Sequence, residues 1–92
     1  MAAKPPTKAQ KARWVRLREY GCLICRAHSP SIHHLFTGAG GRKDHDKVAP
    51  LCHNHHQGKK DGLHEIGRKA FAARFMSEQE MQEKAEIIAP YF

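Results

Sequence analysis

The first segment in which apolar positions recur with helical spacing is residues 7 to 20. Trp14 and Leu17 lie three residues apart, and lysines and arginines occupy most of the remaining positions. Thr7 and Gln10 have the spacing of a capping box, and a glycine follows residue 20. The pattern therefore predicts an amphipathic basic helix over residues 7 to 20 that packs one face on the rest of the domain.

Two short strands are predicted after this helix. Residues 31 to 36 and 48 to 51 are rich in β-branched and apolar residues, and Pro50 suits a strand end. The segment 37 to 47 combines glycines with charged residues, which is typical of a loop between strands.

The carboxyl-terminal half predicts further helices. One begins near Cys52 and is interrupted by GKKDG at residues 58 to 62. A second is expected over residues 63 to 75, and a third starts at a capping box and ends before Pro90. The apolar residues of the expected 63 to 75 helix recur at helical spacing: Leu63, Ile66, Ala70, Phe71 and Phe75. The chain is thus expected to be one α+β domain over residues 1 to 92.

Ninety-two residues bury a modest core, so an additional stabilising element is expected. Three cysteines cannot all pair in intramolecular disulfides, and neither a signal peptide nor an apolar run of membrane-spanning length is seen. The thiols are therefore expected to be metal ligands in a reducing cytosol, which predicts a cytoplasmic protein without a membrane partner.

The formal net charge of +7 is unevenly distributed. Lysines and arginines dominate residues 1 to 20, whereas the last stretch is acidic. A basic surface of this kind favours a polyanion, and nucleic acid is the commonest such partner. The alternative is a solvated basic face without a ligand.

The cysteines have the spacing of a zinc site. Cys22 and Cys25 form a C-x2-C pair, and Cys52 with His55 repeats that spacing. Together they predict a tetrahedral structural Zn²⁺ of Cys3His type, with His28 as the rival for the fourth position. The alternative, three inert buried thiols, fits this regular spacing poorly.

Other histidines are expected to serve a second purpose. On a helix, His56 is turned by about 100° from His55, so it faces away from the zinc. His33 and His34 sit together on the first predicted strand. Since adjacent strand residues point to opposite faces, His33 and His34 share one site only if the strand ends or bulges there.

The chain resembles the HNH nuclease superfamily. These nucleases have a His-His or Asp-His pair ending the first strand, a loop, and LCxxC or LCxxH followed by histidine. Within the superfamily it looks most like the recombination-enhancement (Ref) group of phage and prophage nucleases. The matching segments run from about residue 20 to 75 and are CLIC, IHHL, GGRK, APLCHNHHQG and GLHEIGRKAF.

The resemblance implies a small zinc-stapled ββα-metal (HNH, treble-clef-like) domain with flanking helices. The basic amino-terminal helix would cover residues 7 to 20 and the zinc knuckle with the ββα core residues 22 to 57. The carboxyl-terminal helices would cover residues 63 to 89.

The resemblance also implies roles for the histidines. His34 would be the general base, and His33 and His56 would ligate a catalytic Mg²⁺, Mn²⁺ or Zn²⁺. It suggests His64 as a further ligand, against the alternative of a surface histidine. His53 has no counterpart in the family pattern and is expected to be exposed.

One family position is occupied differently. The asparagine of the HNH pattern aligns with Lys47, which as a cation can neither ligate a metal nor accept a hydrogen bond from the base. Asp44, His45 and Asp46 are the candidates to replace it, and His45 is preferred because of its position after GRK.

Two functions are therefore expected from different classes. The first is a metal-dependent endonuclease that hydrolyses phosphodiester bonds of single- or double-stranded DNA, with a RecA filament implied as a partner by the Ref resemblance. The second is a zinc-knuckle nucleic-acid-binding or recombination accessory module without catalysis, which Lys47 favours.

Overall fold

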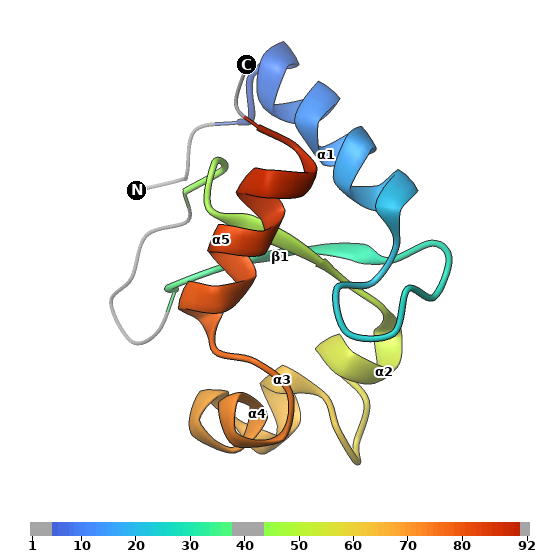
Figure 1. Cartoon of the computed structure of the whole chain (residues 1–92), viewed down its shortest axis with the longest axis vertical. Coiled ribbons are helices and arrows are strands. Elements are labelled where there is room, and N and C mark those ends of the chain that lie inside the picture. Colours follow the sequence, from blue (N-terminus) through green and yellow to red (C-terminus); the bar gives the residue numbers. More distant parts are fainter. Residues whose placement is uncertain (1–4, 38–43, 91–92) are drawn as a thin grey trace.

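The computed structural model describes residues 5–37 and 44–90 (Figure 1). Arg42 and Lys43, basic loop residues from which the sequence predicts a contact with phosphate, lie outside the described residues. Helices and strands combine into an α+β fold, as the sequence predicts. The elements in chain order are α1 (Lys8–Tyr20), β1 (Ser31–His34), β2 (Val48–Leu51), α2 (His53–His56), α3 (Leu63–Ile66), α4 (Arg68–Arg74) and α5 (Glu78–Ile88).

The two strands form an antiparallel sheet at the centre of the fold. Ser31 pairs with Leu51 and His34 pairs with Val48, so the register is regular along the whole of β1. All four residues of β2 are buried. Residues 22 to 28, which follow α1, are called the knuckle. The N–H of Leu23 in the knuckle donates to the Pro50 carbonyl of β2 at 3.0 Å and so connects the two segments.

Helix α1 confirms the predicted capping box at its start. The Thr7 hydroxyl accepts from the Gln10 N–H at 3.1 Å, and the Gln10 side chain accepts from the Thr7 N–H at 2.8 Å. Leu17 is fully buried in a cluster with Val48, Ala85 and Ala89. Helix α1 therefore packs against both the sheet and the carboxyl-terminal helix.

Arg13 does not belong to the basic surface that is expected over residues 1 to 20, because it is buried. This side chain is 3% exposed, and it donates to the Ala89 carbonyl at 2.7 Å and to the Asp46 carbonyl at 2.8 Å. Arg16 also donates to the Pro90 carbonyl at 3.1 Å. The two arginines thus join α1 to the carboxyl-terminal end, beside which α1 lies in Figure 1.

Helix α5 begins and ends as predicted. Ser77 and Glu80 form both bonds of the second capping box, and the helix ends at Ile88, before Pro90. Met81 and Ala85 are fully buried on its inner face, which packs against β2. Figure 1 shows α5 crossing the sheet.

The prediction of one helix over residues 63 to 75 is wrong, because the chain breaks at Gly67. This residue has a φ of +87°, which ends α3 and starts α4 in a new direction. Glycine adopts this conformation at little cost, whereas an L side chain is strained there. Leu63 and Phe71 still share one core, so the apolar spacing is satisfied by two helices instead of one.

None of the helices in residues 5–37 and 44–90 combines the length and the apolar character needed to cross a bilayer.

Candidate metal-binding sites

The structure brings Cys22, Cys25, Cys52 and His55 together, with one ligand atom from each lying within 4.8 Å of the others. Cys22 and Cys25 come from the knuckle after α1. Cys52 is the N-cap of α2 and His55 lies in its single turn. His28, the rival for the fourth position, is exposed and is not a member of this group.

The spacing of these atoms suits a tetrahedral zinc ion. Two thiolates that each lie about 2.3 Å from such an ion are about 3.8 Å apart. The Sγ atoms of Cys25 and Cys52 are 3.7 Å apart, and the Cys22 Sγ lies 3.8 Å from the His55 Nδ1. The Cys3His group is therefore near enough to hold a metal ion, consistent with a structural zinc.

The knuckle is shaped to present its two thiols. The Arg26 N–H donates to the Cys22 carbonyl at 2.8 Å and closes a tight turn around Cys25. Arg26 and Ser29 have positive φ values of 63° and 57°, so the chain reverses sharply before β1. Phe75 packs edge-on against the His55 ring at 5.0 Å and covers the side of this site.

The thiols differ in their tendency to ionise. Burial raises the pKa of Cys52 above its usual value. Burial also acts to raise the pKa of Cys22, but hydrogen bonds from the backbone N–H groups of Cys52, Cys25 and Ile24 outweigh it, and the pKa is lowered. Zinc binding needs thiolates, so binding at this site is expected to release protons.

A second group contains His33 of β1, His56 of α2 and His64 of α3, again with ligand atoms within 4.8 Å of one another. The Nε2 atoms of His56 and His64 are 2.9 Å apart. The His33 ring lies 5.0 Å from the His56 ring and 5.1 Å from the His64 ring, measured between centroids. The structure therefore places His64 beside His33 and His56, and it leaves His53 exposed, as expected.

A tight turn places His64 opposite His56. The two helices are joined by residues 57 to 62, in which Gly58 and Gly62 touch through their backbones. The Gly62 N–H donates to the Gly58 carbonyl at 2.8 Å. A Cβ at position 62 would collide with the Gly58 backbone. The glycines of GKKDG therefore act as a close-packed connection that lets both imidazoles face the same point.

Ser31 orients the His56 ring toward the group. Its Oγ donates to the Leu51 carbonyl at 3.2 Å and lies 2.8 Å from the His56 Nδ1. In the His56 tautomer that carries its proton on Nδ1, this nitrogen donates to Ser31 while the hydroxyl donates to Leu51. The lone pair on His56 then lies on Nε2, which faces His64, as in metal sites where the second ring nitrogen is held by a hydrogen bond.

Two histidines of this group, His56 and His64, favour the neutral form that binds metals. Burial, together with repulsion from His33, His64 and His53, lowers the pKa of His56 to about 4. Burial and the neighbouring His33 lower the pKa of His64, although Glu78 acts in the opposite direction. Neutral imidazole is the ligand form, so protons compete weakly for these nitrogens near neutral pH.

Glu78 lies beside His33 and was not predicted as a site residue. Its side chain is 8% exposed, and its Oε2 is 3.7 Å from the His33 Nε2. Burial acts to raise the pKa of Glu78, but His33, the Phe36 N–H and Arg68 outweigh it, so the pKa is lowered. The acidic character of the last stretch of the sequence gave no sign that one glutamate would be buried.

His34 belongs to a different cluster from its neighbour His33. Its Nε2 lies 3.0 Å from the His45 Nδ1, and both rings contact the Trp14 ring edge-on at 5.6 Å and 5.5 Å. The indole N–H of Trp14 donates to the His45 carbonyl at 2.9 Å. The structure therefore joins the predicted base to His45, the preferred replacement for the asparagine, and adds Trp14, which was predicted only as a core residue.

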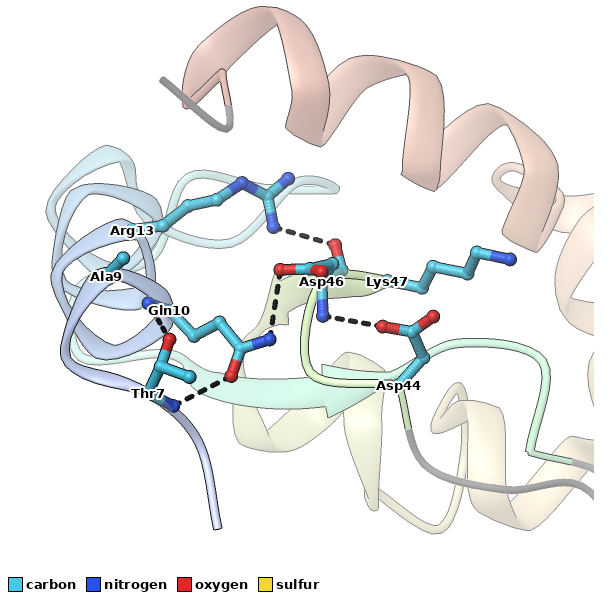
Figure 2. Close-up of a pocket in the computed structure, with 7 residues that line it drawn as sticks. All are labelled: Thr7, Ala9, Gln10, Arg13, Asp44, Asp46 and Lys47. Atoms are coloured by element: carbon cyan, nitrogen blue, oxygen red, sulfur yellow. Dashed lines mark hydrogen bonds between the residues drawn. The ribbon is translucent and has the colours of Figure 1, made fainter. Parts of the chain in front are cut away.

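A cleft of about 460 Å³ lies between α1 and residues 44 to 47 (Figure 2). Asp46 accepts from the Gln10 side chain at 3.1 Å, and Asp44 accepts from the Asp46 N–H at 2.9 Å. Neither histidine cluster lines this cleft. The hydrogen bonds of the two carboxylates fix the segment that leads into β2. The lining residues are Thr7, Ala9, Gln10, Arg13, Asp44, Asp46 and Lys47.

No protein-family model matches the chain, and no curated protein matches it at a significant level.

Proposed function

We propose that this protein is a metal-dependent endonuclease of the HNH, or ββα-metal, type that hydrolyses phosphodiester bonds in DNA. One observation carries the proposal. His33 of the first strand, His56 of the helix after the second strand and His64 gather their ligand atoms within 4.8 Å, next to a separate Cys3His group. A zinc staple beside a histidine site on a β-β-α unit is the arrangement expected from the sequence resemblance.

The residues of the three-histidine site suit a divalent cation. The His33 Nε2 is buried, and none of the described residues forms a hydrogen bond with it. A buried ring nitrogen without such a partner fits a metal ligand, because burying an unpaired polar atom is otherwise costly. A cation held by His33, His56 and His64 would stabilise the negative charge that develops on the phosphate.

In this proposal His34 removes a proton from the attacking water. The water oxygen forms a bond to phosphorus while the bond to the 3′ oxygen breaks, which leaves a 5′-phosphate and a 3′-hydroxyl protonated from solvent. His45 and Trp14 hold the His34 ring in one orientation through the contacts described above. β1 ends at His34 and the chain turns at Leu35. A phosphate placed across this end of the strand would be able to reach both the ion at His33 and the base His34.

Exposed basic side chains on two sides of the fold suit DNA as the substrate. Lys8, Lys11 and Arg18 are exposed on α1, and Lys59 and Lys60 are exposed beside His56 in the turn between α2 and α3. Contacts of this kind neutralise phosphates and release counterions. A RecA filament as the natural form of the substrate remains part of the proposal and is included in its test.

The test is cleavage of supercoiled plasmid, single-stranded circles and RecA-coated DNA with Mg²⁺, Mn²⁺ or chelator. We expect His56→Ala to abolish cleavage and His34→Ala to lower its rate by about 10²- to 10⁴-fold, the usual contribution of a general base. His53→Ala, at an exposed neighbouring position, should cut like the wild type. Cleavage by His34→Ala at the wild-type rate, or cleavage in chelator with the zinc content unchanged, would contradict the proposal.

A second candidate is a nucleic-acid-binding or recombination accessory module with the same fold and no catalysis. The separation of His34 from the three-histidine group favours it, since that histidine is engaged with His45 and Trp14. Salt-sensitive binding of DNA in filter assays, with no cleavage of any of the three substrates under any of the ions, would support this function over the first.

A further inference from the structure

Phe36 is an exposed aromatic residue just beyond the end of β1. Its exposed fraction is 38%, larger than that of any other Phe, Trp or Tyr in residues 5–37 and 44–90. It follows the proposed base His34 by two positions, and its N–H lies 2.7 Å from the Glu78 oxygen that faces His33. Single apolar side chains are common on protein surfaces, so exposure alone does not indicate a binding site.

The backbone of Phe36 adopts a strained conformation. Its φ of +59° lies in the left-handed region, which residues with large side chains rarely adopt. Strained residues persist only where the surrounding structure holds them, and they are concentrated at functional sites. Arg26 and Ser29 also have a positive φ, and they shape the knuckle that carries two ligands of the Cys3His group. The conformation of Phe36 indicates that the end of β1 is constrained in a similar way.

A buried carboxylate holds this conformation. The Phe36 N–H donates to the Glu78 Oε2 at 2.7 Å, and Glu78 is 9% exposed. The other oxygen, Oε1, forms an ion pair with the Arg68 Nε at 2.7 Å. The preceding residue, Leu35, is buried, and its N–H donates to the Lys47 carbonyl at 2.9 Å. The backbone is thus fixed from two sides, whereas the Phe36 ring stays accessible to solvent.

A cation lies next to the exposed ring. The Lys47 Nζ is 6.0 Å from the centroid of the Phe36 ring, at the outer limit of a cation–π contact. Lys47 is itself exposed, so an anion can reach its ammonium group. A nucleotide combines a flat base with an anionic phosphate. An aromatic ring beside an ammonium group offers a complementary surface to each of these two parts.

We propose that Phe36 is a stacking platform for one nucleobase of the DNA and that Lys47 contacts a phosphate next to this base. The inference rests on the proposed function and specifies the form of its substrate. A base inside a duplex is already stacked on its neighbours, so a base on Phe36 comes from a single strand or is flipped out of a duplex. The platform therefore favours unpaired DNA, with little dependence on sequence because every base has a face that stacks.

The test compares binding of a fluorescein-labelled single-stranded oligonucleotide with binding of its duplex, measured by fluorescence anisotropy. The protein carries one equivalent of zinc, and no other ion is added. Phe36→Leu removes the ring but keeps an apolar side chain under the same backbone constraint. We expect this variant to bind the single strand about 10-fold more weakly, the usual contribution of one stacked base, and the duplex less than about 3-fold more weakly.

Two control variants separate stacking from apolar contact. Phe36→Tyr keeps an aromatic ring and should bind the single strand like the wild type. Ile87→Ala removes another exposed apolar side chain, on α5, and should also bind like the wild type. Equal losses for the single strand and the duplex in Phe36→Leu, or wild-type affinity of this variant for the single strand, would overturn the inference.

Lys47→Gln tests the phosphate contact. It should weaken binding of both forms of DNA and reduce the slope of log affinity against log salt concentration by about 1. An unchanged slope would overturn the contact assigned to Lys47.

Ultraviolet crosslinking of the wild type gives a measurement that does not depend on a variant folding. Oligonucleotides that carry iododeoxyuridine at each position in turn should form an adduct with Phe36, identified by mass spectrometry, and adducts at other residues alone would overturn the inference. Binding that needs the Phe36 ring in a protein that cuts no DNA would reject the nuclease function and retain the platform. Cleavage with an unchanged preference for single strands in Phe36→Leu would overturn the platform and retain the nuclease.

Discussion

His33 and His34 are neighbours in β1, yet they contact different sets of histidines. The His33 ring lies against His56 and His64, whereas the His34 Nε2 is 3.0 Å from the His45 Nδ1. Regular pairing of β1 with β2 explains the division, because successive side chains of a strand point to opposite faces. In the proposed reaction, the three-histidine ion site would act from one side of β1 and the base His34 from the other.

Removing a ligand of the Cys3His group should unfold much of the domain. Structural zinc contributes about 10 to 16 kcal/mol of binding free energy in zinc-finger peptides, comparable to the whole stability of a small domain. Cys52→Ser is therefore expected to lose one zinc per chain and most of its helical circular dichroism. His28→Ala, outside the group, should keep both. Full zinc content in Cys52→Ser would show that the ion is held elsewhere.

Trp14→Phe should weaken the orientation of the proposed base without loss of the fold. The substitution keeps an aromatic ring against His34 and His45 but removes the indole N–H that donates to the His45 carbonyl at 2.9 Å. We expect a loss of about 1 kcal/mol of stability and a fall of about 10-fold in cleavage rate, with a changed pH profile.

Val15→Ala is the matched control for this substitution, since Val15 is exposed on the same helix. It should retain both stability and rate. If Trp14→Phe and Val15→Ala cut DNA equally fast at every pH, Trp14 contributes to packing and not to the orientation of the base.

Arg13→Met should destabilise the protein by about 2 to 4 kcal/mol. The guanidinium donates to the buried Ala89 carbonyl and to the partly buried Asp46 carbonyl, and its loss leaves both acceptors without these bonds. Urea unfolding monitored by circular dichroism measures the effect. Arg18→Met, at an exposed position of the same helix, should change the free energy of unfolding by less than about 0.5 kcal/mol. Similar values for the two variants would contradict the assigned role of Arg13.

Gly67→Ala should cost about 1 to 2 kcal/mol even though there is space for the methyl group. A Cβ at this position would meet no atom within 4 Å, so the cost comes from the φ of +87° and not from a collision. Gly67→Asn should cost about as much, because the ψ of 161° lies outside the left-handed helical region that asparagine tolerates. Thermal unfolding of the zinc-loaded proteins separates these outcomes, and equal stability of Gly67→Ala and the wild type would show that the bend relaxes.

The local features of the sequence predicted the local structure well. The capping boxes at Thr7 and Ser77 place the starts of α1 and α5, because a cap depends on residues three positions apart. The spacing of the cysteines with His55 predicts their grouping for a similar reason. Two ligands from each of two short turns have few other ways to meet.

The features that the sequence did not predict depend on contacts between distant segments. Arg13 reads as a surface residue of a basic helix, and its carbonyl partners lie 33 and 76 residues away. The sequence likewise places Glu78 in an acidic surface, because its partners His33 and Phe36 lie far from it along the chain. The break at Gly67 was missed because the apolar spacing on its two sides fits one helix as well as two, and periodicity carries no sign of φ.

The contact of Arg13 with the Ala89 carbonyl also has a practical consequence for protein production. A chain shortened to end with α5 at Ile88 would lose this acceptor and leave a buried guanidinium without its shortest hydrogen bond. Expression trials and domain fusions should therefore keep the chain through residue 90 and place affinity tags beyond it. Residues 89 and 90 follow α5. Their carbonyls accept from Arg13 and Arg16, so these two residues help to fix the position of α1.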